Sequence, residues 1–165
     1  MHAFSISSFS LLLWDKGDLA AAEPLCREAL QAQRATLNER HPHTLKSINN
    51  LGILLRAKGD LAAAEPLLRE ALEARRETLG DRHPDTLISI NSLGVLLKEK
   101  GELAAAEPLF REALVMRRKT LGKRHPDTLI SASNLGLLLK AKWSSRPQWN
   151  NNFSRGGRIY DGRGR

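Results

Sequence analysis

Cysteine and aromatic residues are scarce in this chain of 165 residues, which has one cysteine, Cys26, and 5% aromatic residues. A single cysteine excludes a disulfide framework within the chain and favours a reducing compartment. The sequence also lacks any apolar run near the roughly 18 residues that a membrane-spanning helix requires. We therefore predict a cytoplasmic protein that does not act at a membrane.

Sequence signatures of catalysis are absent as well. The chain has no glycine-rich phosphate loop, no paired-carboxylate motif and no nucleophile elbow. Cys26 falls at an apolar position of an internal repeat, where we expect a small buried side chain with no base beside it. His41, His83 and His125 recur about one repeat apart, too far to ligate one metal ion, so we assign them a structural role in turns. The sequence predicts a protein that is not an enzyme and needs no cofactor and no metal.

The main feature of the sequence is a repeat of 42 residues. The phrase GDLAAAEPL begins at Gly17 and at Gly59, and GELAAAEPL begins at Gly101. A second phrase, RHPHTL or RHPDTL, recurs with the same spacing. Residues 37–78 and 79–120 are identical at 29 of 42 positions when they are compared in order. Such regularity is typical of a solenoid built from stacked units.

Each unit is predicted to form two helices. In the third unit, Pro84 suits the first position of a helix, and apolar residues follow at helical spacing until Gly101 caps its end. The second helix begins after Gly101, and Arg117 and Arg118 near its end match the helix dipole. Its predicted buried stripe consists of Leu103, Ala106, Leu109, Phe110, Ala113 and Leu114.

The repeat also predicts the domain organisation. We expect a repeat domain over residues 1–142, with units of about 1–36, 37–78 and 79–120 and a half unit over 121–142 whose one helix runs from about Pro126 to Ala141. The fold class is all-α, a right-handed superhelical solenoid of antiparallel helix pairs with about seven helices. Residues 143–165 differ in composition: they are rich in Arg and Gly and hold about half of the net charge of +8. We predict that they form a basic, disordered tail.

The pattern of small and large residues resembles that of tetratricopeptide repeats. In the second unit the matching residues are Leu51, Gly52, Leu55, Ala64, Leu68 and Ala71. The 42-residue period and the phrases LAAAEPLFREAL and LGDRHPDTL are similar to the repeats of kinesin light chains, over roughly residues 1–142. Kinesin light chains also have N-terminal heptads that join the motor heavy chain, and this sequence has none. The resemblance therefore implies the repeat type, and with it a protein-binding scaffold, but not a motor subunit.

The resemblance also implies where a ligand binds. First helices of such units line a concave groove that suits an extended peptide or a partner helix. The residues predicted to face this groove are Lys46, Asn49, Asn50, Ile53 and Arg56 in the second unit, Ile88, Asn91, Val95 and Lys98 in the third, and Ser133, Asn134, Leu137 and Lys140 in the last.

Asparagine and basic residues give the predicted groove its chemistry. In related repeats, Asn residues of the first helices hold the main chain of the ligand, because an amide both donates and accepts hydrogen bonds. We expect Asn49 and Asn91 to do so here, and the alternative is that these amides only face water. The basic residues of the groove would favour an acidic peptide, and the alternative is a solvated, unspecific charged surface. They are Lys46, Arg56, Lys98 and Lys140.

Two further hypotheses remain open. The chain could be a fragment of a longer repeat array, with no independent function and with weak self-association through its exposed terminal repeats instead of a monomeric state. Alternatively, the tail of residues 143–165 could bind nucleic acid through its Arg–Gly pairs and interspersed aromatic residues. We regard a protein or peptide ligand as the leading hypothesis.

Overall fold

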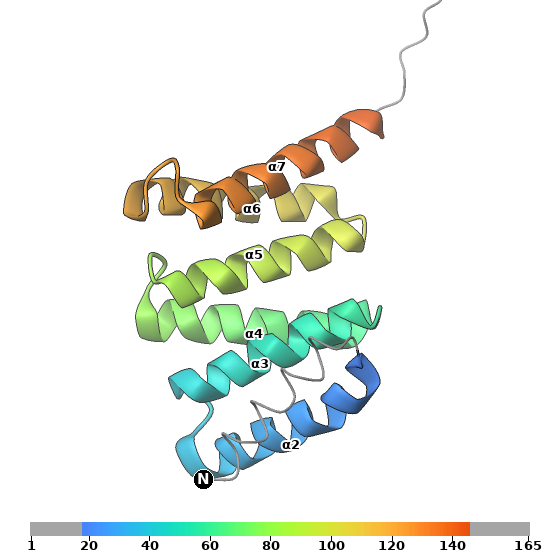
Figure 1. Ribbon diagram of the computed structural model, residues 1–165, viewed down its shortest axis with the longest axis vertical. Helices are drawn as coiled ribbons and strands as arrows, with labels where there is room; N and C mark the ends of the chain where they lie inside the picture. Colours follow the sequence, from blue (N-terminus) through green and yellow to red (C-terminus); the bar gives the residue numbers. More distant parts are fainter. Residues whose placement is uncertain (1–17, 146–165) are drawn as a thin grey trace, which may run out of the picture.

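The chain forms a stack of helices, which confirms the predicted fold class. A computed structural model describes residues 18–145. Of the seven or so helices predicted, six lie in this range, and the one expected before them falls outside it. The six helices are α2 (Leu19–Leu37), α3 (Pro42–Ala57), α4 (Leu61–Leu79), α5 (Pro84–Glu99), α6 (Leu103–Thr120) and α7 (Pro126–Ser144) (Figure 1).

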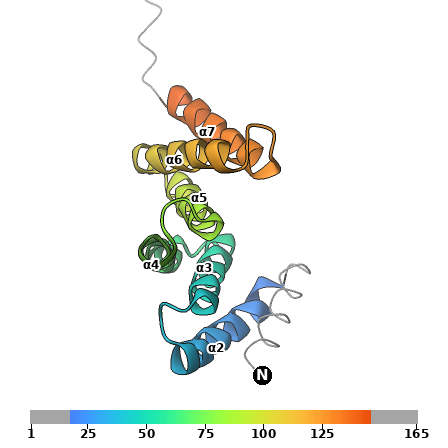
Figure 2. The same cartoon turned by 90° about the vertical axis from the view of Figure 1, so that its left-hand side faces the viewer.

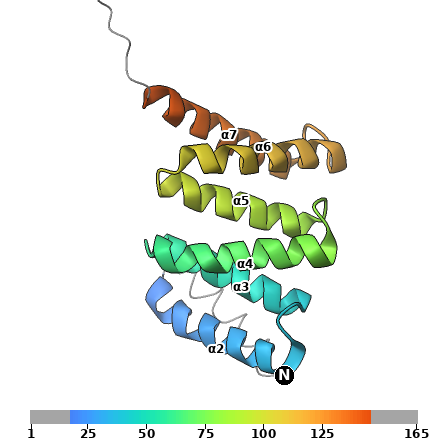
Figure 3. The same cartoon turned by 180° about the vertical axis from the view of Figure 1, so that it is seen from behind.

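Antiparallel pairs follow one another along a single axis. α3 pairs with α4 and α5 pairs with α6, while α2 and α7 are the second helix of the first unit and the first helix of the last unit. The first helices α3 and α7 lie in front of α4 and α6 in Figure 1, and behind them in Figure 3. Figure 2 shows the units rising from α2 at one end to α7 at the other. Within residues 18–145, none of the helices has both the length and the apolar character needed to cross a membrane.

Each first helix begins with the same histidine–proline cap. The Nδ1 atoms of His41, His83 and His125 accept hydrogen bonds from the backbone N–H two residues later, at 3.2, 3.1 and 3.2 Å. The following proline occupies the first helical position, where an N–H would have no partner within the helix. The structure thus shows the histidines in the turn role that their repeat spacing predicts.

Glycine ends the first helices of the two inner units, and its absence lengthens α7. Gly59 and Gly101 have φ angles of +86° and +81°, a conformation that other L residues adopt only with strain. Trp143 stands at the equivalent position of the last unit, and α7 continues through it to Ser144. The helix therefore ends three residues after the predicted Ala141, so the first residues of the predicted tail are helical.

Packing within each pair depends on a second glycine. A Cβ atom built on Gly52 would lie 2.7 Å from Leu68 Cδ2, and one built on Gly94 would lie 2.8 Å from Phe110 Cε1. The first helix therefore presents bare backbone to a large apolar side chain of the second helix. Leu68 and Phe110 are fully buried, which contributes about 1.5–3 kcal/mol each. Around them lies one continuous apolar core from α2 to α7.

Ion pairs that recur with the repeat join each unit to the next. Glu65 of α4 accepts from Lys100 at the end of α5 at 2.5 Å and from Arg69 of its own helix at 2.8 Å. Glu23 pairs with Lys58 and Arg27, and Glu107 with Lys142 and Arg111. Hydrogen bonds from the lysine, and then from the arginine, lower the pKa of all three carboxyl groups. Each pair is partly open to solvent, so each contributes modestly on its own.

Replacing Gly94 with alanine should destabilise the protein, whereas the same change at Gly136 should not. Gly136 occupies the equivalent position of α7, where an added Cβ would meet no atom within 4 Å. We expect Gly94→Ala to lower the free energy of unfolding by about 1–3 kcal/mol through overpacking. Gly136→Ala should raise it by up to about 1 kcal/mol, because alanine favours the helix. Urea denaturation followed by circular dichroism measures both, and equal effects would contradict this account of the pair.

Replacing Glu65 with glutamine should make the stability of the protein less sensitive to acid. The folded pKa of Glu65 lies below the ordinary value of 4.5, so its stabilising effect is present above about pH 4.5 and is lost as the pH falls through the folded pKa. The free energy of unfolding should fall less between about pH 7 and about pH 3 in Glu65→Gln than in the unsubstituted chain.

Glu73→Gln is the matched control, because Glu73 is an exposed carboxylate of the same helix with no ion pair within residues 18–145. Identical acid sensitivity of the two variants would contradict the role assigned to the Glu65 pair.

Candidate functional site

Most of the residues predicted to face the groove lie on one connected surface, which we call the first-helix face. It is formed by adjoining sides of α3, α5 and α7. Among its members, Lys46, Ile88, Leu137 and Lys140 are exposed, as is Ser133, and the others are half-buried. The half-buried members are Asn50, Ile53, Arg56, Asn91, Val95, Lys98 and Asn134.

Asn49 lies beneath this surface instead of on it. Only 2% of its area is exposed, and its Oδ1 accepts a hydrogen bond from Ser89 Oγ of α5 at 3.2 Å. The amide therefore joins α3 to α5 in the interior, and a ligand on the surface has no direct access to it in this arrangement. Its equivalent Asn91 is half-buried and reaches the surface.

Polar contacts tie the neighbouring first helices together across the face. Asn134 Nδ2 of α7 donates to Asn91 Oδ1 of α5 at 2.8 Å. Arg56 of α3 forms an ion pair with Glu99 of α5 at 2.8 Å. The positive charge of Arg56 is thus already balanced within the protein, which leaves the lysines as the cations available to a ligand.

Three lysines and several apolar residues give this surface its character. Lys46, Lys98 and Lys140 have no ion pair within residues 18–145. Leu137 is 53% exposed, and Ile88 is exposed as well. Apolar groups beside unbalanced cations can bind a segment that is both acidic and partly hydrophobic.

One exposed apolar residue was missed from the sequence. Ile130 of α7 is 50% exposed. It lies 42 positions after Ile88, so the repeat spacing that located the other members would also have located this one. It extends the apolar part of the first-helix face towards the start of α7.

The sequence also failed to reveal a buried arginine that supports this face from behind. Arg75 of α4 is 3% exposed, and its Nη1 donates to the Asp85 carbonyl and to Ser89 Oγ, both at 2.8 Å. Because Ser89 in turn donates to Asn49, one chain of hydrogen bonds crosses α4, α5 and α3. Burial lowers the pKa of the Arg75 guanidinium, and the Asp85 carboxylate opposes that shift.

Arg117 of α6 is the equivalent arginine of the next unit and makes equivalent contacts. Arg117 donates to the Asp127 carbonyl at 3.0 Å and to Ser131 Oγ at 2.9 Å. It is buried in the last turn of α6, so it does more than match the helix dipole. In the first unit Gln33 takes the equivalent position, and its buried Oε1 has no hydrogen-bond partner among residues 18–145. The sequence signal was an Arg and a Ser that recur together, 14 residues apart, in two successive units.

Comparison with known families finds matches that recur with about the same period as the repeat. The family model described as tetratricopeptide repeat matches residues 6–77, 49–119 and 91–142. The chain belongs to the tetratricopeptide repeat family. A comparison with curated protein sequences gives no significant match. Tetratricopeptide repeats generally mediate contacts between proteins, and folds of this type are typically non-catalytic scaffolds.

Solved structures show the subtype of the repeat. A Podosopora anserina chain named as a candidate kinesin light chain, with nearly identical tetratricopeptide-like repeats, superposes with a TM-score of 0.81 at 25% identity. A variant of the same protein gives 0.80 at the same identity, and in both cases the match covers 86% of this chain and 67% of the other. BtubC (BKLC) from P. vanneervenii gives 0.78 at 24% identity, covering 86% of this chain and 56% of that one. The kinesin light chain-like type predicted from the sequence is confirmed.

Replacing Asn49 with alanine should destabilise the protein, because the change leaves the buried Ser89 hydroxyl without its acceptor. We expect the free energy of unfolding to fall by about 1–2 kcal/mol. The neighbouring Asn50→Ala is the control, since Asn50 is half-buried and should change stability by less than about 0.5 kcal/mol. Urea denaturation of the two variants decides the matter. An unchanged stability of Asn49→Ala would show that the amide is not part of the internal support.

Proposed function

We propose that the chain is a monomeric, non-catalytic cytoplasmic scaffold that binds an acidic peptide segment of a partner protein along the first-helix face. The family supports an interaction with another protein. The observation that carries the finer proposal is that each first helix has one lysine without an acidic partner among residues 18–145: Lys46 near the start of α3, and Lys98 and Lys140 near the ends of α5 and α7. Because no internal ion pair within residues 18–145 uses these three ammonium groups, they can act on a ligand.

The arrangement of the face indicates how such a segment would be held. The exposed Ile88, Ile130 and Leu137 offer apolar contacts between the lysines. Asn91 and Asn134 present a hydrogen-bonded amide pair at the same surface, and free donor and acceptor capacity remains on both amides. Acidic side chains would fix the register of the segment against the lysines, and apolar side chains between them would supply most of the binding energy. Asn49 contributes only by supporting α5 from below.

A selection from a displayed peptide library on the full chain tests this function. We expect the enriched peptides to combine Asp or Glu with apolar residues, and to bind more weakly as the salt concentration rises. The double variant Lys98→Glu/Lys140→Glu should weaken the binding of a selected peptide by about tenfold or more, since two attractive contacts become repulsive. Fluorescence anisotropy with the labelled peptide measures this loss.

A variant with the same change of charge elsewhere controls for non-specific attraction. Lys119→Glu/Lys123→Glu alters two exposed residues, one in α6 and one in the loop before α7, that lie outside the first-helix face. It should leave the affinity within about twofold of the original after correction for net charge. Equal losses in the two double variants would indicate general electrostatic attraction and would contradict a site on the first helices.

The nucleic-acid alternative concerns the predicted tail, of which residues 146–165 lie outside those described. It stays a sequence-based hypothesis, and removal of residues 146–165 separates it from the proposal, because peptide binding at the first-helix face should survive the deletion.

A further inference from the structure

The first helix of the last unit has a side that is covered in the two preceding units. In α5, the residues that face α6 include Leu87 and Leu97, each 2% exposed. Their equivalents in α7 are Leu129 and Leu139, which are 56% and 39% exposed. We call this side of α7 the end face, formed by Leu129, Ala132, Gly136 and Leu139. It is distinct from the first-helix face, which lies on another side of the same helix.

Gly136, the glycine of the end face, lacks the large side chain that covers the equivalent glycines of the inner units. Gly52 and Gly94 are each covered by a large side chain of the following helix, Leu68 or Phe110. At Gly136, an added Cβ would meet nothing within 4 Å. The backbone of α7 is therefore open at the one position where the first helices of the inner units receive their largest neighbour.

An unbalanced charge lies beside this surface. Arg34 of α2 pairs with Glu70 of α4 at 2.6 Å, and Arg76 of α4 pairs with Glu112 of α6 at 2.7 Å. Arg118 is the next member of this series, and within residues 18–145 it has no acidic partner. In both completed cases the glutamate stands two residues after the large apolar side chain that covers the glycine. Arg118 without an acidic partner and Gly136 without a covering side chain would therefore both be satisfied by one second-type helix packed on α7.

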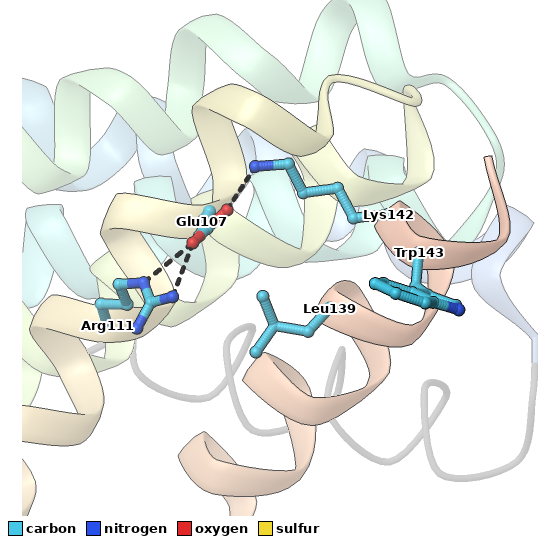
Figure 4. A pocket seen from close by; sticks show the side chains of 5 residues that line it. All are labelled: Glu107, Arg111, Leu139, Lys142 and Trp143. Atoms are coloured by element: carbon cyan, nitrogen blue, oxygen red, sulfur yellow. Dashed lines mark hydrogen bonds and ion pairs between the residues drawn. The ribbon is translucent and has the colours of Figure 1, made fainter. Parts of the chain in front are cut away.

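A cavity marks one end of the surface. It has a volume of about 280 Å³ and is lined by Leu139 and Trp143 of α7 together with Lys142 and two residues of α6 (Figure 4). In the figure, Glu107 is held between Arg111 and Lys142, while Leu139 and Trp143 project from α7 beside them. The charged groups of the cavity are already paired with one another, so its apolar wall is the part that an incoming side chain would contact.

We propose that the end face binds, in trans, a helix of another tetratricopeptide-type protein that has the second-helix pattern of this chain. The pattern is a small residue, a large apolar residue four positions later and a glutamate two positions after that, as in Ala106, Phe110 and Glu112. The large residue covers Gly136, and the glutamate pairs with Arg118. Charge complementarity and the two internal examples, α4 and α6, identify this occupant. The binding completes a fourth helix pair and is independent of peptide binding to the first-helix face.

A peptide with the sequence of residues 101–122 is the probe, because it contains all of α6 and its flanking residues. Labelled with a fluorophore and titrated with the full chain, it should bind saturably. Gly136→Leu should abolish binding, since the leucine would occupy the volume that the peptide phenylalanine needs. The variant should remain folded, because a Cβ built on Gly136 meets no atom of residues 18–145 within 4 Å, and circular dichroism verifies this.

Charge exchange between protein and peptide tests the orientation of the helix. Arg118→Glu should weaken binding by about two- to fivefold, as expected for a partly exposed ion pair. A peptide with Glu112→Arg should bind the unsubstituted chain equally weakly, and it should recover affinity for Arg118→Glu. Recovery by the doubly exchanged pair shows a specific contact, whereas additive losses would overturn the assigned geometry.

Other occupants of the end face would each overturn the proposal with a distinct result. Binding only after removal of residues 146–165 would show that the chain's own C-terminal segment covers the face. A dimer of the unsubstituted chain that Gly136→Leu converts to a monomer, measured by analytical ultracentrifugation, would identify a second copy, whose α2 has the phrase LAAAEPLCREAL. No binding by any form, or equal binding to Gly136→Leu, would exclude a second-helix site on α7.

Discussion

The close contact between a glycine of one helix and a large apolar side chain of the next is the constraint on which the rest of this architecture depends. Leu68 over Gly52 and Phe110 over Gly94 fix the distance between the two helices of a pair. With that distance set, the remaining sides of the first helix are free for two other tasks. One side packs against the preceding unit, and the other contributes to the first-helix face. A bulkier residue at the glycine position would move all three surfaces at once.

The charged side chains also differ in role between the contacts that join units, the interior and the first-helix face. The glutamates that recur with the repeat, such as Glu65, are satisfied by a lysine of the next unit and an arginine of their own helix. Arg75 and Arg117 are satisfied inside, by backbone carbonyls and serine hydroxyls. Many of the ionic groups between neighbouring helices are paired in this way. Lys46, Lys98 and Lys140 on the first helices and Arg118 at the end of α6 are among the cations without an ion pair within residues 18–145, and the two proposed binding surfaces use them.

The sequence predicted the helices and turns well because a 42-residue period reports the role of each position in a unit. The turn role of the histidines, the glycine turns and most of the buried residues followed from that role, whereas Leu103, Leu109 and Cys26 were expected to be buried and are half-buried. The burial of individual side chains did not follow from the repeat position, because burial depends on which side chains of the neighbouring unit contact that position. Asn49 and Asn91 occupy the same position of the repeat but have different partners. Asn49 accepts a hydrogen bond from the buried Ser89. Asn91 instead accepts one from Asn134 at the surface, and Asn134 occupies the position that Ser92 has in the third unit. The extension of α7 through Trp143 depended in the same way on a single departure from the repeat.

The helices pack mainly against their neighbours in the chain, as expected for a solenoid. A change in the shape of such a stack is the sum of small changes at the contacts between neighbouring helices. The contacts across the first-helix face include an ion pair between α3 and α5 and an amide pair between α5 and α7. Salt screens the ion pair and leaves the amide pair nearly unchanged, so the two contacts between first helices respond differently to ionic strength.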